Sequence, residues 1–286
     1  MLECCRREWY PEVAALARRL PYFLYLDAIL KARSGEYFPG HRYIWRKDGR
    51  IVATCTLAYL NPDDAWLHGM RVDPRCKNRG IATAFTRQLL RVAARAGRTW
   101  VGLDTPHHPY PAPVFRIAEK LGMRLEGTFA YDWYGGLAKR FPQPRPQRMA
   151  GIFDHYRMLG EPAVFLSDPG WYWARLLPGR KAWIDQFGFR LAGTPVHLVR
   201  HRHIVQDRQR YVVRTANLYD RPTDFPAFLT GLLGYAVGRR HGLVIRYPAA
   251  WKDDLRRAAR GLVPNLCPGR TCRLSVSRLY GRRLTP

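Results

Sequence analysis

The sequence predicts an α/β fold of the α+β type, in which helices flank a mixed sheet and the same layout occurs twice in tandem. Three observations support this. Strand-like segments alternate with segments of helical periodicity, the order of elements in residues 51–129 recurs in the second half, and a proline-rich stretch separates the halves. We expect a first domain over 1–136, a linker over 137–152 and a second domain over 153–286.

The first half opens with helical and hairpin signals. Residues 11–33 are typical of one or two helices, and Pro21 should break them because proline lacks an amide proton. Segments 43–45 and 51–59 are strand-like. Asp48 and Gly49 between them favour the positive φ angles of a tight hairpin turn.

A third strand is predicted over 66–72, and an amphipathic helix over 79–96 follows it. Apolar side chains recur on one face of this helix at α-helical spacing: Ile81, Phe85, Leu89, Val92 and Ala96. Gly97 follows where a C-terminal cap belongs. A strand over 99–105, a helix over 113–121 and a strand over 123–129 complete the first half.

The second half shows the same order of elements without repeating the residues. Strands over 197–200 and 210–215 precede a helix over 225–239, a strand over 243–247, a helix over 251–262 and a strand over 272–279. The segment between the halves is rich in proline and polar residues, so we expect a semi-rigid linker there.

Composition indicates a soluble globular protein, with 47% hydrophobic and 24% charged residues. No apolar run reaches the roughly 18 residues of a membrane span. The first residues also lack the apolar core of a signal peptide. We therefore expect a cytoplasmic protein with no membrane partner.

The net charge of +26 favours encounters with anionic partners, nucleic acid among them. The arginines are spread along the chain, as a GC-rich, codon-biased source would also produce, so charge alone does not favour nucleic acid. Six cysteines form no paired CxxC arrangement, and we expect no metal. A zinc site from Cys267, Cys272 and a distant histidine stays an alternative.

The segment 72–83 has the clearest chemical signal, because it follows a strand and opens a helix. Backbone amides at a helix start have no intrahelical partner, and the helix dipole adds positive potential. Gly80 and Ala82 let an anion approach the backbone, and Lys77 and Arg79 add charge. The pattern favours a cradle for a pyrophosphate.

Residues 66–123 resemble the GNAT acetyltransferase superfamily. Its signature is Arg or Gln, two residues, Gly, one residue, then Gly or Ala. Lys77-Asn-Arg-Gly80-Ile-Ala82 fits it with lysine at the first position. Glu119-Lys-Leu-Gly-Met123 resembles a later signature of the superfamily, and the upstream hairpin extends the resemblance to most of residues 11–130.

This resemblance implies a sheet whose fourth and fifth strands splay apart to admit acetyl-CoA, which donates its acetyl group to a primary amine by direct attack on the thioester. The amine would belong to a small molecule or a protein N-terminus. Pantetheine would pair with Met70, Arg71 and Val72. The residues implied for the pyrophosphate are Lys77, Asn78, Arg79, Gly80, Ile81, Ala82 and Thr83. The second half contains no such loop, so we expect it to shape the acceptor site.

His68 is predicted to accept the proton of the amine. On a regular strand Trp66, His68 and Met70 share one face, which would place His68 in the acceptor cleft beside Trp66. An imidazole that titrates near neutrality suits a general base. A bulge at Gly69 would change these facings. Asp104, near the end of the next strand, borders the same cleft and is a second candidate for acceptor binding.

The sequence departs from the superfamily at the group that protonates the departing thiolate. Many relatives have a tyrosine at the position of Ala118, and Tyr110 is the candidate replacement. This departure leaves a CoA-binding sensor without catalysis as one alternative. A basic RNA- or ribosome-binding protein on the same scaffold is another.

Overall fold

A computed structural model describes residues 1–20, 40–106, 112–135, 141, 146–159, 164–167, 172–206, 209–236, 241–262 and 275–284. The chain forms two compact units. The first consists of Met1–Asp104, Pro111–Leu125 and Tyr280–Pro286, and the second of Thr105–Tyr110 and Glu126–Leu279.

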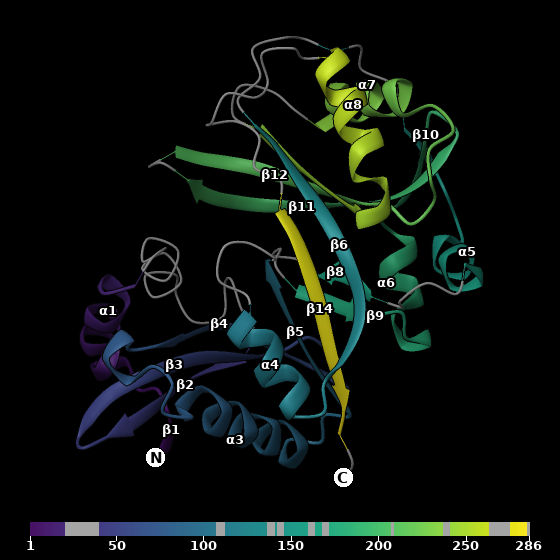
Figure 1. The fold of residues 1–286 in the computed structure, drawn as a ribbon. Coiled ribbons are helices and arrows are strands. Elements are labelled where there is room, and N and C mark those ends of the chain that lie inside the picture. Colours follow the sequence, from purple (N-terminus) through teal and green to yellow (C-terminus); the bar gives the residue numbers. More distant parts are fainter. Residues whose placement is uncertain are drawn as a thin grey trace. The chain divides into compact units, whose positions relative to one another are not determined.

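The first unit is a mixed sheet with helices on both faces (Figure 1). Its strands lie in the order β1 (Leu2–Cys4), β2 (Gly40–Lys47), β3 (Arg50–Tyr59), β4 (Asp64–Val72) and β5 (Trp100–Pro106), followed by the end of β14 (Ser275–Arg283). Its helices are α1 (Tyr10–Arg18), α3 (Ile81–Arg95) and α4 (Ala112–Lys120). Neighbours from β1 to β4 are antiparallel, and β4 and β5 are parallel.

The predicted hairpin and amphipathic helix are confirmed. Asp48 and Gly49 between β2 and β3 have φ angles of 49° and 72°, which both central residues of a type I′ turn require. The helix ends as expected at Gly97, whose φ is 75°. There the amides of Gly97 and Arg98 donate to the carbonyls of Ala94 and Ala93, as in a Schellman cap. The predicted helical segment after Pro21 lies outside the described residues.

The main core of the first unit lies between the sheet and the helices α3 and α4. It includes Phe85 and Leu89 of α3, Phe115 of α4, and Cys55 and Leu57 of β3. On the opposite face α1 packs on the sheet, with a smaller cluster made by Val13, Leu16, Ile44 and Ile51.

The end of β14 completes the first core, although the sequence pattern places this segment with the second domain. Tyr280 is 2% exposed, and its ring lies 5.6 Å from that of Phe115. Leu284 donates its amide proton to the carbonyl of Thr99 at 2.8 Å. The first unit therefore needs a segment that is synthesised last.

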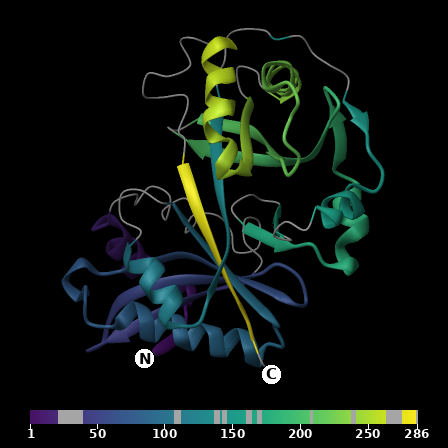
Figure 2. The same ribbon diagram turned by 45° about the vertical axis from the view of Figure 1, so that its right-hand side comes forward.

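The strands of the second unit lie in the order β6 (Arg124–Gly135), β13 (His241–Pro248), β12 (Gln209–Asn217), β11 (Thr194–Gln206), β10 (Gly188–Leu191) and β7 (Gln147–Arg148). A separate hairpin pairs β8 (Val164–Ser167) with β9 (Tyr172–Arg175). The helices are α5 (Ile152–Met158), α6 (Lys181–Asp185), α7 (Phe225–Ala236) and α8 (Lys252–Leu262). The two helices α7 and α8 pack side by side (Figure 2).

The predicted order of strand, strand, helix, strand and helix over 197–262 is confirmed in the second unit. The short elements β7 to β10, α5 and α6 were not predicted. Much of the predicted linker over 137–152 lies outside the described residues, and its bounds stay a prediction.

We expect Tyr280→Ala to lower the free energy of unfolding by about 3–5 kcal/mol, because it removes a buried aromatic ring and leaves a cavity. Urea denaturation compared with Arg283→Ala, an exposed neighbour, measures the difference. Equal unfolding midpoints for the two variants would show that the end of β14 contributes nothing to the core.

Candidate active site

Strand β4 contains a bulge. Thr56 of β3 lies opposite His68, and Thr54 lies opposite Arg71, so two steps along β3 match three along β4. Gly69 inside the bulge has a φ angle of 62°. Glycine adopts this left-handed conformation readily, and such a residue in one strand of a pair is typical of a β-bulge.

The bulge reverses the side-chain alternation of β4. Ala65 and Leu67 lie in the core under α3 and α4, so the pleat directs Trp66 and His68 to the other face. Met70, beyond the bulge, packs against the same core as Ala65 and Leu67. The prediction that Met70 shares a face with Trp66 and His68 is therefore wrong, because it assumed a regular strand.

The pairing of β4 with β5 ends just before the bulge. Their parallel pairing is limited to Asp64–Trp66 on β4 and Trp100–Gly102 on β5. In the second unit the corresponding parallel strands β12 and β13 stay paired from Val212 to Asn217. The parallel pairing in the first unit is thus short and leaves Leu67–Val72 of β4 unpaired with β5, whereas the second unit keeps its pairing at the same place in its element order.

The loop after β4 leads into a helix whose first backbone amides lack a hydrogen-bond acceptor from a capping side chain. Gly80 is the N-cap of α3 with a φ angle of 72°, and it supplies no side-chain cap. The first turn of α3 contains no acidic residue, so the amides of Ile81, Ala82 and Thr83 have neither an intrahelical nor a carboxylate acceptor among the described residues. Space is open at Gly80, since a Cβ there would meet nothing within 4 Å.

Asp73 anchors this loop, and the sequence reading missed it. Its buried carboxylate accepts hydrogen bonds from the backbone amide and guanidinium of Arg75 at 2.7–3.1 Å, and from Arg19 at 3.1 Å. The hydrogen bonds from Arg75 hold the pKa of Asp73 well below its usual range. Asp73 followed by proline at a strand end is a turn signal that could have identified it.

The equivalent helix start in the second unit is capped by a side-chain carboxylate. Asp224 precedes α7, and its carboxylate accepts the amide proton of Ala227 at 2.9 Å. A carboxylate at this position satisfies a free amide and offsets the helix dipole. The start of α7 is therefore unsuited to a second anion.

Residues 6–110 match the model of the acetyltransferase (GNAT) family. They form a GNAT domain. The strands β4 and β5, the bulge and the loop before α3 all lie within the matched residues.

Solved structures extend the likeness to the whole chain. A candidate acetyltransferase from Thermoplasma acidophilum has 13% identity and a TM-score of 0.55, with coverage of 99% of this chain and 100% of that one. A tandem GNAT protein from the clavulanic acid biosynthesis pathway has 12% identity and a TM-score of 0.50, with coverage of 100% and 99%. No curated protein matches the sequence. At these identities the likeness concerns the fold, which is that of a tandem GNAT protein.

His68 of the GNAT domain is buried, and Arg42 and Arg71 are near enough for their charges to act on it. Arg42 and His68 both lie opposite Thr56, one on each side of it. Burial, followed by the charges of Arg42 and Arg71, lowers the pKa of His68 to about 3. The imidazole is therefore neutral at pH 7, and its titration lies far below the near-neutral range expected from sequence.

Trp66 packs in the interior of the GNAT domain. It is fully buried, and its ring lies 6.1 Å from that of Trp100. Both rings lie against Gly102, where a Cβ would come within 2.1 Å of Trp100 and 2.4 Å of Trp66. A glycine inside a strand signals such a close approach. Asp104, two residues further along β5, is partly buried.

The remaining predicted positions have different outcomes. Ala118 of α4 is fully buried in the core, while Tyr110 lies outside the described residues. Among the described residues no group of three or more His, Cys, Asp or Glu side chains is placed to hold a metal ion. None of the described helices combines the length and apolar composition needed to cross a membrane.

We expect Asp73→Asn to lower the free energy of unfolding by about 2 kcal/mol at pH 7, because charge-assisted hydrogen bonds to Arg75 and Arg19 are lost. The folded pKa of Asp73 is depressed, so its stabilisation is present above the unfolded value of about 3.9 and is lost as the pH falls. The gap between wild type and variant should therefore shrink near pH 3. Chemical denaturation at both pH values measures it, with the exposed Asp63→Asn as control. A gap of constant size would argue against an ionised anchor.

Proposed function

We propose that the chain is an N-acetyltransferase that uses acetyl-CoA, with the cofactor bound in its GNAT domain. The observation that supports this most directly is the separation of β4 and β5 beside the uncapped start of α3. A thioester arm fits between separated strands, and a pyrophosphate fits the free amides at the helix start.

Backbone and side-chain groups of the loop are proposed to contact the pyrophosphate in different ways. The amides of Ile81, Ala82 and Thr83 donate hydrogen bonds, and the open space at Gly80 lets the phosphate oxygens reach the backbone. Exposed side chains at Lys77, Asn78 and Arg79 surround the same turn. Asp73 holds the first part of the loop through its hydrogen bonds from Arg75.

The backbone of β4 from Met70 to Val72 is proposed to pair with pantetheine, because β5 no longer occupies that edge. The acceptor amine, on a small molecule or a protein N-terminus, then approaches from the face of His68. Its nitrogen attacks the thioester carbonyl, the carbon–nitrogen bond forms, and the carbon–sulfur bond breaks to release the thiolate. Backbone donors at the bulge would stabilise the oxyanion.

His68 is proposed to take the proton that the amine loses. Since its pKa is about 3, it is neutral throughout the working range and cannot deprotonate a free ammonium effectively. The amine must arrive uncharged, and His68 accepts a proton only as the nitrogen gains positive charge during attack. Two arginines near His68 also disfavour the approach of a cationic ammonium.

The departing thiolate lacks the usual proton donor, since Ala118 is buried and aliphatic. Tyr110 stays a proposal for this role, and release as the thiolate with protonation by water is the alternative. The second unit, whose β12–β13 pairing and capped α7 leave no equivalent cradle, is proposed to shape acceptor binding.

A second candidate function is a CoA-binding sensor that does not turn over. Ala118 in place of a proton donor favours it. Acetylation of any amine in a library screen would exclude the sensor, whereas CoA binding with no product from any amine would favour it.

We expect Lys77→Glu and Gly80→Glu to weaken acetyl-CoA binding at least tenfold, because each places a carboxylate beside the pyrophosphate and Gly80 also has a positive φ angle. Isothermal titration calorimetry measures the affinity. Lys47→Glu, an exposed lysine in the β2–β3 turn region with the same charge change, should bind as wild type. Wild-type affinity in both loop variants would refute the assigned cradle.

We expect His68→Gln to lower kcat/KM by about 100-fold, the scale of general base catalysis, at every pH between about 6 and 9. The shape of the profile should stay that of wild type, because His68 does not titrate in this range and the rise with pH reports the amine. Stopped assays of CoA release with the best acceptor from the screen measure both profiles. An inflection near pH 6.5 that disappears in the variant would contradict a neutral His68.

A further inference from the structure

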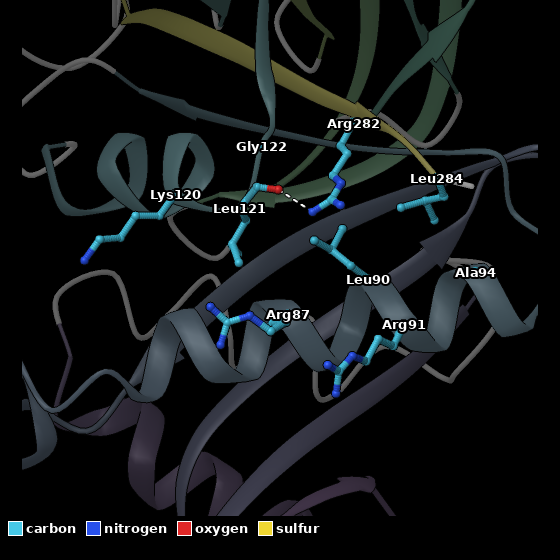
Figure 3. A pocket seen from close by; sticks show the side chains of 9 residues that line it. All are labelled: Arg87, Leu90, Arg91, Ala94, Lys120, Leu121, Gly122, Arg282 and Leu284. Carbon is cyan, nitrogen blue, oxygen red and sulfur yellow. Dashed lines mark hydrogen bonds between the residues drawn. The ribbon is translucent and has the colours of Figure 1, made fainter. Parts of the chain in front are cut away.

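A cavity of about 550 Å³ lies in the first unit, away from the cofactor loop. Its walls come from the C-terminal half of α3, the end of α4 and the C-terminal segment (Figure 3). The lining residues are Arg87, Leu90, Arg91, Ala94, Lys120, Leu121, Gly122, Arg282 and Leu284. We call it the basic pocket.

Every charged side chain of the basic pocket is cationic. Arg87, Arg91 and Lys120 are exposed, and among the described residues none of them has a carboxylate within 4.0 Å. Arg282 donates a hydrogen bond to the carbonyl of Leu121, which holds its guanidinium at the wall (Figure 3). The floor between these groups is apolar.

The cations of α3 also repel one another. Arg87, Arg91 and Arg95 follow at intervals of four residues, so they lie on one side of the helix, and like charges at that spacing destabilise a helix. The helix contains no acidic residue that could offset them. An external anion along this row would relieve the repulsion.

The basic pocket is distinct from the cofactor loop. At a rise of about 1.5 Å per residue, Arg87 and Arg91 lie roughly 10 Å and 16 Å along α3 from Gly80. Its anion would therefore be a ligand other than the pyrophosphate bound at the start of the helix.

We propose that the basic pocket and the Arg87–Arg91–Arg95 row bind the sugar–phosphate backbone of single-stranded nucleic acid. Arginine matches phosphate with paired donors, and the row continues past the pocket as a line, which suits a chain of phosphates better than a single anion. The net charge of +26 gives the attraction its range. No aromatic residue lines the pocket, so its contacts are to phosphates, which carry no sequence information, and sequence preference should be weak.

The test is fluorescence anisotropy with a labelled uridine oligoribonucleotide of about 20 nucleotides, long enough to exceed one typical binding site. The pocket variant is Arg87→Glu/Arg91→Glu/Lys120→Glu. The matched control is Arg7→Glu/Lys47→Glu/Arg50→Glu, which changes the same number of exposed cations elsewhere in the first unit. We expect at least a tenfold loss of affinity in the pocket variant and less than threefold in the control. The slope of log K against log salt should fall by about 2 in the pocket variant.

Equal losses in the two variants would overturn the proposal, since they would report net charge alone. Absence of RNA binding by the wild type at about 0.15 M salt would overturn it as well. Equally tight, pocket-dependent binding of polyglutamate or of anionic phospholipid vesicles would reject nucleic acid as the partner. Circular dichroism checks that both variants fold. Acetyl-CoA titration should be unchanged in both, so failure of the enzymatic proposal and failure of this one remain distinguishable.

Discussion

The bulge at Gly69 is the constraint on which the candidate site depends. One extra residue in β4 alters its direction and its side-chain facing, and pairing with β5 ends just before it, at Trp66. A parallel pair that stayed in register would leave neither an open edge at Met70–Val72 nor a route to the start of α3. His68 and Met70 also face opposite sides only because of this residue. The change of facing thus has one local cause, and the end of the β4–β5 pairing lies directly beside it.

The second unit shows what the same element order becomes without that cause. β12 and β13 remain paired up to Asn217, and Asp224 supplies the carboxylate that an external phosphate would otherwise replace. Both differences are local, and neither requires a change of fold. Two units with one layout can therefore differ in function while their cores are built in the same manner.

Features set by local chemistry could be predicted from sequence. The turn at Asp48–Gly49, the apolar stripe of α3 and its cap at Gly97 depend on neighbours a few residues apart, and all were found. Tyr280 could not be placed, because its partner Phe115 lies far away in the chain and no periodicity reports such a contact. The lowered pKa of His68 could not be predicted for the same reason. It results from burial and from the charges of Arg42 and Arg71, which three-dimensional packing brings close to the imidazole. The bulge lies between these cases, since Gly69 permits it but does not require it.

The dipole of α3 favours an anion at the start of the helix and cations at its end. Its start offers uncapped amides and the positive end of the dipole, so positive potential there is intrinsic to the backbone. Towards its end the dipole is negative and favours Arg95, but it reaches only the last turn and does little for Arg87. The cations in the middle of the helix are therefore stabilised by neither the dipole nor an acidic neighbour on α3. The row of arginines lowers the stability of α3, and no carboxylate in the described part of the chain pairs with Arg87 or Arg91. We therefore look for their anionic partner outside the protein.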